Sequence, residues 1–200
     1  MDKTETIAKY GAMMMELPYS VGDVPRILFK QDDRCFVTAE DADFTHIKDE
    51  DIVDVTNMES PEIQTLMAMD EMNAMVLSNP PYIGICIESR HEIHAVLDDM
   101  AQIVGRTVKV VPHTTKSIGK ALRGSAAAMV KDGYVITCGR NLYEAYVAMT
   151  VLEKSAEVLL KSAVLGGSVP ISAMDAKLMR EFYKRKYSKA EKEHKDDTEG

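Results

Sequence analysis

An apolar run that ends at two consecutive prolines constrains the fold of this chain most strongly. Residues 73–78 read Asn-Ala-Met-Val-Leu-Ser, and Asn79, Pro80, Pro81 and Tyr82 follow. An apolar run of this length is typical of a buried strand. A proline has no backbone N–H and therefore cannot continue a hydrogen-bonded ladder. We predict a strand over 73–78 that ends before Pro80.

The composition is that of an ordinary globular protein. The chain has 200 residues, of which 46% are hydrophobic and 28% charged, enough for one domain with its own core. A formal charge of −8 argues against nucleic acid or an anionic membrane as the main partner, because both favour a basic surface. No window approaches the ~20 continuous apolar residues of a membrane span, and early charged residues interrupt any signal-like run. Three widely spaced cysteines without a C-x-x-C pair indicate reduced, buried thiols, so we expect a cytoplasmic protein.

Short strands and longer helices alternate irregularly along the chain. The predicted strands cover residues 26–30, 34–38, 52–55, 73–78, 108–111, 125–130 and 134–138. The predicted helices cover residues 4–17, 60–69, 91–104, 116–122, 141–165 and 173–183. Two of the strand pairs are hairpins, which favours an α/β fold with a central, mostly antiparallel or mixed sheet flanked by helices. We expect one domain over 1–183 and a charged, disordered tail over 184–200.

Asn79-Pro80-Pro81-Tyr82 taken alone resembles the catalytic tetrapeptide of the amino-methyltransferases that act on adenine. Such an enzyme needs a glycine-rich loop after a strand, where the backbone approaches adenosylmethionine closely. The only glycines before Asn79 are Gly11 and Gly22, and Gly166-Gly167 follows a long helix. The missing cofactor loop argues against a methyltransferase.

Seven short segments along the chain suggest a relationship to a different family. They are ILFK at 27–30, CFVT at 35–38, DEDIV at 49–53, SPE at 60–62, NAMVLSNPPY at 73–82, ITCGRNLYEA at 136–145 and LEKSAE at 152–157. With these segments the chain resembles, from Ile7 to about Ser172, the class II aldolase/adducin-like family, which includes fuculose-phosphate and ribulose-phosphate lyases and epimerases. The resemblance implies a three-layer α/β/α domain. It also implies a homotetramer with the pocket at a subunit boundary.

The resemblance further implies three zinc-binding histidines, and none is present here. In the family two of them lie two residues apart on one strand, so that both side chains reach one zinc ion. Those positions are Leu77 and Asn79, and the third, in a turn, is Asp132. Leucine has no donor atom and an amide is a poor zinc ligand. We therefore predict that the protein holds no zinc and no other cofactor.

The phosphate site of the family is altered as well. Its G-N-[LI]-S loop corresponds to residues 25–28, Pro-Arg-Ile-Leu, where proline removes a backbone donor. Its second phosphate contact corresponds to residues 38–41, where Glu40 and Asp41 repel a dianion. We expect no binding of sugar phosphates. The pocket positions that the resemblance retains are Thr38, Ser60 and Asn79.

Four side chains remain as catalytic candidates. Glu62 matches the family's acid/base residue, although the helix dipole alone favours a glutamate in a first turn. His113 matches a position that borders the family's pocket, and Tyr82 or Tyr134 would complete the set.

Two metal sites built from other residues are weaker alternatives. His91 and His94 are three residues apart on a predicted helix, but no third ligand is near them in the sequence. Glu62, Asn79 and Asp132 together would offer oxygen ligands to magnesium.

The sequence thus leads to two hypotheses of function. The first is a non-catalytic or repurposed class II aldolase-fold protein that binds a small-molecule ligand or serves assembly. The second is a metal-independent lyase or isomerase that acts on a small carbonyl or sugar substrate through Glu62 and His113, with Tyr82 or Tyr134.

Overall fold

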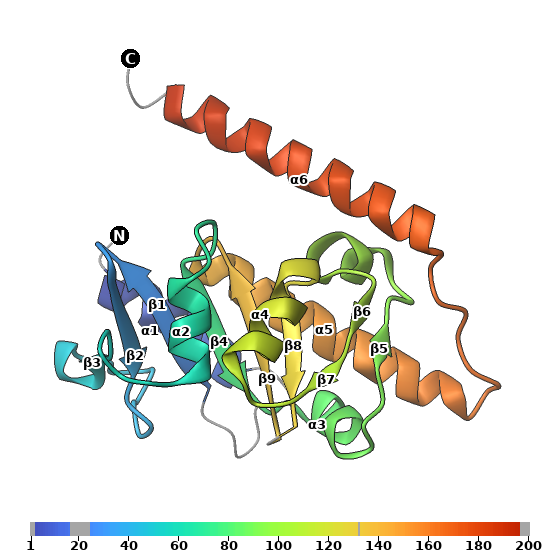
Figure 1. Ribbon diagram of the computed structural model, residues 1–200, viewed down its shortest axis with the longest axis horizontal. Coiled ribbons are helices and arrows are strands. Elements are labelled where there is room, and N and C mark those ends of the chain that lie inside the picture. Colours follow the sequence, from blue (N-terminus) through green and yellow to red (C-terminus); the bar gives the residue numbers. More distant parts are fainter. Residues whose placement is uncertain (1–2, 17–24, 132, 197–200) are drawn as a thin grey trace.

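One mixed sheet lies between two layers of helices in the computed structural model, which describes residues 3–16, 25–131 and 133–196 (Figure 1). Its strands are β1 (Arg26–Gln31), β2 (Arg34–Thr38), β3 (Ile52–Asp54), β4 (Ala74–Ser78), β7 (Val110–Val111), β8 (Ala127–Val130) and β9 (Tyr134–Gly139). Their order is β3-β2-β1-β4-β9-β8-β7. Every neighbouring pair is antiparallel except β7 and β8. The predicted single α/β domain with a mostly antiparallel, mixed sheet is confirmed.

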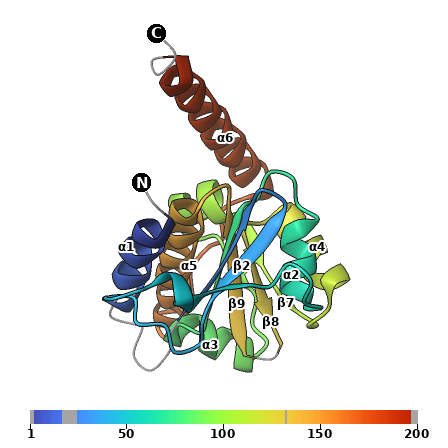
Figure 2. The same ribbon diagram turned by 90° about the vertical axis from the view of Figure 1, so that its left-hand side faces the viewer.

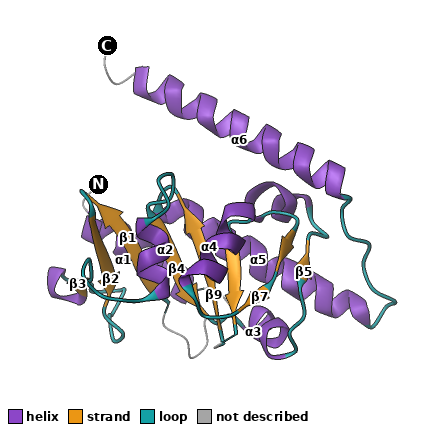
Figure 3. Ribbon diagram, in the orientation of Figure 1, coloured by secondary structure: helices purple, strands orange, loops and turns teal. Residues whose placement is uncertain are grey.

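Helices cover both faces of this sheet (Figures 2 and 3). The helical elements are α1 (Lys3–Met15), η1 (Asp49–Asp51), α2 (Pro61–Met67), α3 (Pro81–Glu88), η2 (Met100–Val104), α4 (Thr115–Gly124), α5 (Leu142–Ala163) and α6 (Ala173–Asp196). Seen along the sheet, α1 and α5 lie on one side and α2 and α4 on the other. A small second sheet pairs β5 (Ile93–His94) with β6 (Thr107–Val108).

The two faces of the sheet bury separate apolar clusters, because successive side chains of a strand point to opposite faces. In β4, Ala74 and Val76 belong to the cluster that includes Leu152 of α5. Met75 belongs to the cluster that includes Leu66 of α2, and Leu77 packs against it. The face toward α2 and α4 is the one that carries the candidate site.

Local signals explain where several elements begin. Asp32 and Asp33 both have positive φ (49° and 60°), which lets two residues close the tight β1–β2 hairpin. The hydroxyl of Ser60 accepts a hydrogen bond from the Ile63 N–H (3.2 Å) at the start of α2. Asn141 Oδ1 likewise accepts from the Glu144 N–H (3.0 Å) at the start of α5. The helix starts predicted at these two positions are confirmed.

Three elements differ from the prediction. The helix predicted over 91–104 is wrong in its first half, where Ile93 pairs with Val108 as a strand. Helix α3 was not predicted. The last helix does not end near Tyr183 but continues to Asp196, over part of the segment predicted to be a disordered tail. The end of the first predicted helix, at Leu17, lies outside the described residues.

Helix α3 begins against a buried carboxylate. Glu153 of α5 is 1% exposed, and its two carboxylate oxygens accept hydrogen bonds from the backbone N–H groups of Tyr82 and Ile83 (2.9 Å each). These bonds satisfy backbone donors that the first turn of a helix leaves open. Burial raises the pKa of Glu153 above its usual range, although both hydrogen bonds act against this. A residue of α5 thus fixes the chain directly after β4.

Candidate functional site

The first turn of α2 holds a carboxylate on the face of the sheet that α2 and α4 cover. Ser60 caps this helix and Pro61 is its first residue. The cap and the fixed φ of the proline together hold the backbone of Glu62 in the first helical turn. Glu62 is only 6% exposed. Its neighbours in the helix, Ile63 and Leu66, belong to the apolar cluster on this face.

Two further elements bring polar side chains to Glu62. Tyr134 is the first residue of β9, and His113 follows the end of β7. The carboxylate oxygen Oε1 of Glu62 lies 2.7 Å from His113 Nε2 and also accepts a hydrogen bond from the Tyr134 hydroxyl. That hydroxyl is 3.1 Å from His113 Nε2. The two rings meet edge to face, with their centroids 5.9 Å apart. We call these three residues the acid–base cluster.

Hydrogen bonding keeps the Glu62 carboxylate charged despite its burial. Burial alone would raise the pKa of Glu62, but hydrogen bonds from Tyr134, from its own backbone and from Ser60 stabilise the anion, and His113 adds electrostatic attraction. The net effect lowers the pKa of Glu62 below its ordinary value. At neutral pH the cluster therefore contains a carboxylate that accepts hydrogen bonds from both partners.

The members of the cluster differ in their access to solvent. The side chain of Glu62 is 8% exposed, whereas that of His113 is 35% exposed. A ligand arriving from solvent therefore meets His113 before it meets Glu62. Glu62 bonds to Nε2 of the ring, which assigns the proton there, and Nδ1 is then the nitrogen that can accept a proton.

The other predicted site residues lie apart from this cluster. Thr38 is fully buried, and its hydroxyl accepts a hydrogen bond from the Ile27 N–H (3.0 Å), which ties β2 to β1. Tyr82 packs against the apolar cluster on the opposite face of the sheet, with Lys161 Nζ 5.5 Å from its ring centroid. The structure joins Glu62, His113 and Tyr134 but does not bring Tyr82 to them.

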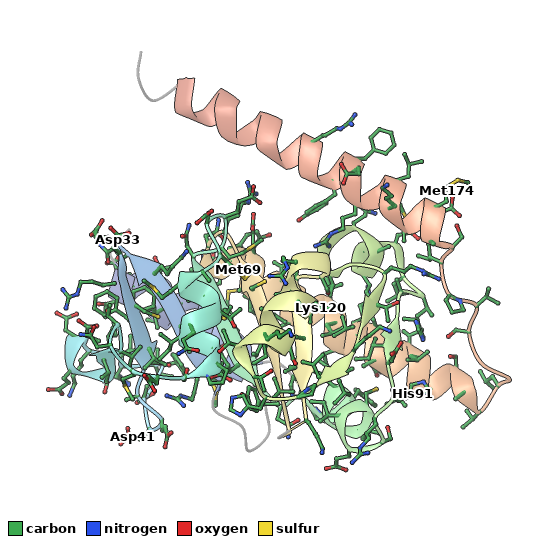
Figure 4. The ribbon with its side chains drawn as sticks, viewed as in Figure 1. Asp33, Asp41, Met69, His91, Lys120 and Met174 are labelled. Atoms are coloured by element: carbon green, nitrogen blue, oxygen red, sulfur yellow. The ribbon has the colours of Figure 1, made fainter. Side chains whose placement is uncertain are left out.

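One charged residue lies beside β4, at the end of the sheet where β1 and β9 begin. Arg26, the first residue of β1, lies directly opposite Leu77 of β4. Its Nη1 is 3.6 Å from Glu40 Oε1, and the Glu40 side chain is 84% exposed. Figure 4 shows Asp41 at the outer end of the molecule, well away from Lys120 on α4. In the sequence, Arg26 stands in place of a neutral residue of the family's G-N-[LI]-S loop.

A comparison with known proteins identifies the relationship. The family described as "Class II Aldolase and Adducin N-terminal domain" matches residues 19–160. The chain belongs to the class II aldolase and adducin family. No curated protein matches its sequence.

Solved structures of class II aldolases share the fold. An L-fuculose 1-phosphate aldolase has a TM-score of 0.78 at 20% identity, covering 90% of this chain and 95% of its own. YgbL of Klebsiella pneumoniae, titled a putative aldolase/epimerase/decarboxylase, has a TM-score of 0.73 at 17% identity, covering 88% and 97%. L-fuculose-1-phosphate aldolase from Thermus thermophilus has a TM-score of 0.68 at 17% identity, covering 84% and 98%. At these identities the likeness establishes the fold alone.

The zinc of the class II aldolases does not fit the donor set on β4. Leu77 offers no donor atom and packs against the apolar cluster of this face. The side chain of Asn79 lies against α3, since a Cβ added at Gly84 would be 2.8 Å from Asn79 Oδ1. Asp132, the third position, lies outside the described residues. Among the described residues no group of three or more His, Cys, Asp or Glu side chains is placed to hold a metal ion.

The predicted histidine pair also lacks the arrangement on which its prediction depended. His94 belongs to strand β5 and not to a helix, so the helical spacing from His91 does not exist. The His94 ring lies 3.3 Å from the Thr107 hydroxyl and 4.0 Å from a Glu92 carboxylate oxygen. His94 pairs with Thr107 in the small β5–β6 sheet, and Glu92 directly precedes β5.

Proposed function

We propose that this class II aldolase-family protein is a lyase or isomerase that moves a proton on a small carbonyl or sugar compound without a zinc ion on β4. The observation that supports it is the acid–base cluster, in which a buried carboxylate bonds to both a histidine and a tyrosine. Burying a charge is costly unless it is paired and hydrogen-bonded. Groups of this kind in a single site are typical of general acid–base catalysis.

Each member of the cluster has a distinct part in the proposed reaction. His113 Nδ1 accepts a proton from the carbon next to the carbonyl group. Glu62 orients the ring and stabilises the imidazolium ion that results. When a ligand binds, the single hydrogen of the Tyr134 hydroxyl turns from Glu62 to the carbonyl oxygen as that oxygen gains negative charge, and Glu62 stays paired with His113. In an isomerisation of an α-hydroxy carbonyl compound, the proton returns to the former carbonyl carbon while the hydroxyl proton passes from one oxygen to the other. In a cleavage, His113 instead takes the proton of the β-hydroxyl group, the bond between the α and β carbons breaks to give an aldehyde and an enolate, and the imidazolium returns the proton to the α carbon.

A non-catalytic binding or assembly protein is the second candidate. Two observations favour it: Leu77 packs against the apolar cluster, and Asn79 packs against α3. Both residues occupy metal-binding positions of the family but make structural contacts here. In that case the acid–base cluster only joins α2 to the sheet.

Metal analysis and kinetics together separate the two candidates. We expect purified protein to contain no stoichiometric zinc. We expect wild-type protein to isomerise or cleave at least one compound in a panel of small carbonyl compounds, and His113→Gln to lower this rate by roughly 10²–10⁴-fold. Glu157→Gln, which changes an exposed carboxylate of α5, is the matched control and should keep the rate. Zinc at one ion per chain, or no turnover with any compound, would contradict the proposal.

We also propose that the protein is a homotetramer of the cytoplasm. Relatives in the family are typically oligomeric. Helix α6 supports assembly because Met174, Leu178 and Phe182 follow each other at four-residue spacing and are 79%, 54% and 61% exposed. The buried, free cysteines support a reducing compartment.

A further inference from the structure

Three large apolar side chains of α6 are exposed. Met174, Leu178 and Phe182 are 79%, 54% and 61% exposed, and their four-residue spacing places them in one stripe along the helix. The opposite side of α6 packs on η2, where Ala176 is buried and Arg180 donates to a backbone carbonyl. Beyond this contact the helix extends away from the body (Figure 1). Because helices in proteins gain most of their stability from packing an apolar face, the stripe requires a partner.

An acidic surface lies at one edge of the sheet. Residues 40–59, which include η1 and the edge strand β3, contain eight Asp or Glu residues and one Lys. Seven of the acidic side chains are exposed, and the eighth, Asp51, is half-buried. The same segment exposes two large apolar side chains, Val53 (44%) and Met58 (59%). We call residues 40–59 the acidic edge, and it combines negative charge with apolar surface.

Charge selects the acidic edge as the surface that covers the stripe. Arg26, Arg34 and Lys48 of the same copy pair with carboxylates of this edge, but they are too few to neutralise all eight. Helix α6 carries eight Lys or Arg against five Asp or Glu. Two copies of α6 packed on each other would bring like charges together, which is unfavourable. The acidic edge offers the opposite charge together with apolar contacts.

The positions of the two surfaces make such a contact head-to-tail. The acidic edge includes β3, at the opposite end of the strand order from β7 and β8. Helix α6 packs on η2, and the η2 residue Val104 accepts a hydrogen bond from the Ala126 N–H (2.7 Å), next to β8. Figure 1 accordingly shows α6 beginning beside β6, far from β3. A contact between two different surfaces leaves one of each free, and a series of them closes into a ring when the rotation per copy allows it.

We propose that α6 of one copy docks through its apolar stripe on the acidic edge of the next copy. This inference rests on the homotetramer proposed above and names the two surfaces that form it. Leu178 and Phe182 pack on Val53 and Met58, and the excess positive charge of the helix lies against the surrounding carboxylates. The contact uses no residue of the acid–base cluster, so turnover is not needed to test it.

Complementation between two variants of the full chain tests the inference. Leu178→Asp with Phe182→Asp removes the stripe, and Val53→Lys with Met58→Lys changes the acidic edge. In analytical ultracentrifugation at micromolar concentration, we expect each variant alone to associate at least about tenfold more weakly than wild type. An equimolar mixture should form a dimer with one copy of each, because the intact helix of one variant fits the intact edge of the other. Lys48→Gln, which makes the edge more acidic, should associate at least as tightly as wild type.

Cross-linking tests the same contact with smaller changes. The native cysteines of the described residues are buried, so Leu178→Cys and Met58→Cys provide exposed thiols. A chain with both substitutions should be joined into oligomers by a bismaleimide, and chains with only one of them should not. Circular dichroism checks that every variant is folded. Oligomers linked through Leu178→Cys alone, or a doubly substituted chain that is not linked between copies, would overturn the inference.

The same measurements separate this inference from the proposed homotetramer. A wild-type tetramer that the edge variant leaves intact, or two dissociated variants whose mixture does not associate, would overturn the docking of α6 on the acidic edge and leave the tetramer in place. A wild-type monomer would contradict both proposals. A dimer in the mixture, with both variants dissociated on their own, would support the head-to-tail contact.

Discussion

At the scale of single residues, Glu62 connects three separate parts of the chain. Through one carboxylate oxygen it bonds to His113 after β7 and to Tyr134 in β9, while its own backbone belongs to α2. The arrangement is a candidate reaction centre, and it also links α2 to the sheet. Its charge state therefore affects folding as well as chemistry.

The lowered pKa of Glu62 gives its contribution to stability a defined dependence on pH. A carboxyl group whose pKa is lower in the folded state binds protons more readily when unfolded. Its contribution is therefore complete above the ordinary pKa near 4.5 and is lost as pH falls through the lower pKa of the folded state. Urea unfolding of wild type and Glu62→Gln should show the largest difference in free energy of unfolding at neutral pH and a smaller one below pH 4.5. A difference that grows on acidification would contradict the assignment of a charged, stabilised Glu62.

The sequence located part of this site. Glu62 and His113 were candidates from their positions in the family pattern, and Tyr134 was named as an alternative to Tyr82. Their convergence depends on the order of β4, β9, β8 and β7, which brings residues from distant parts of the chain close together. Only the strand register shows that Arg26 shares a face of the sheet with Tyr134.

At the scale of elements, the junction of β9 with α5 leaves no room for a side chain. A Cβ added at Gly139 would lie 2.6 Å from the Ala145 backbone N and 2.8 Å from the Asn141 backbone O. Backbone atoms cannot rotate away as a side chain does. Gly139→Ala should therefore lower the free energy of unfolding by about 1–3 kcal/mol.

Gly124 at the end of α4 provides the matched control. A Cβ there would meet nothing within 4 Å. Gly124→Ala should therefore be neutral or raise the free energy of unfolding by up to about 1 kcal/mol, because alanine favours the helix. Urea denaturation of both variants measures the difference. A Gly139→Ala protein as stable as Gly124→Ala would contradict the packing described for this junction.

The sequence predicted those elements whose signals are local. The caps Ser60 and Asn141 marked α2 and α5 correctly, and the two hairpins formed where turn residues separate apolar runs. Helix α3 was missed because the carboxylate that receives its first N–H groups belongs to Glu153, far along the chain. The helix predicted from His91 was wrong because the apolar spacing there fits a helix, whereas Ile93 pairs with Val108 in a strand.

At the scale of the whole molecule, α6 extends away from the body of the protein (Figure 1). One side of the helix packs on η2, where Ala176 is buried and Arg180 Nη1 donates to the Ile103 carbonyl (3.0 Å). Met174, Leu178 and Phe182 leave the opposite side apolar and exposed. None of the described helices is long and apolar enough to cross a membrane.

A second copy of this chain is the partner that we propose for the apolar side of α6. The helix carries eight Lys or Arg residues against five Asp or Glu, whereas the whole chain has a formal charge of −8, so helix and body attract each other between copies. We expect a tetramer in analytical ultracentrifugation at micromolar concentration. Replacing both Leu178 and Phe182 by Asp should produce smaller species, and Glu181→Gln, which changes an exposed acidic residue of the same helix, should not. A wild-type monomer would contradict the proposed assembly.

We propose that this class II aldolase fold carries an acid–base cluster that works without zinc on β4. The exchange of carbon-bound hydrogen for solvent deuterium tests this claim most directly. NMR measures this exchange in pyruvate, levulinate and dihydroxyacetone, with protein that a chelator has depleted of metal. We predict exchange at the carbon next to the carbonyl group that is faster than in buffer, lost by roughly 10²–10⁴-fold in Glu62→Gln and kept in Glu157→Gln. Exchange that requires added zinc, that is unchanged in Glu62→Gln, or that is no faster than in buffer for every compound would contradict the account.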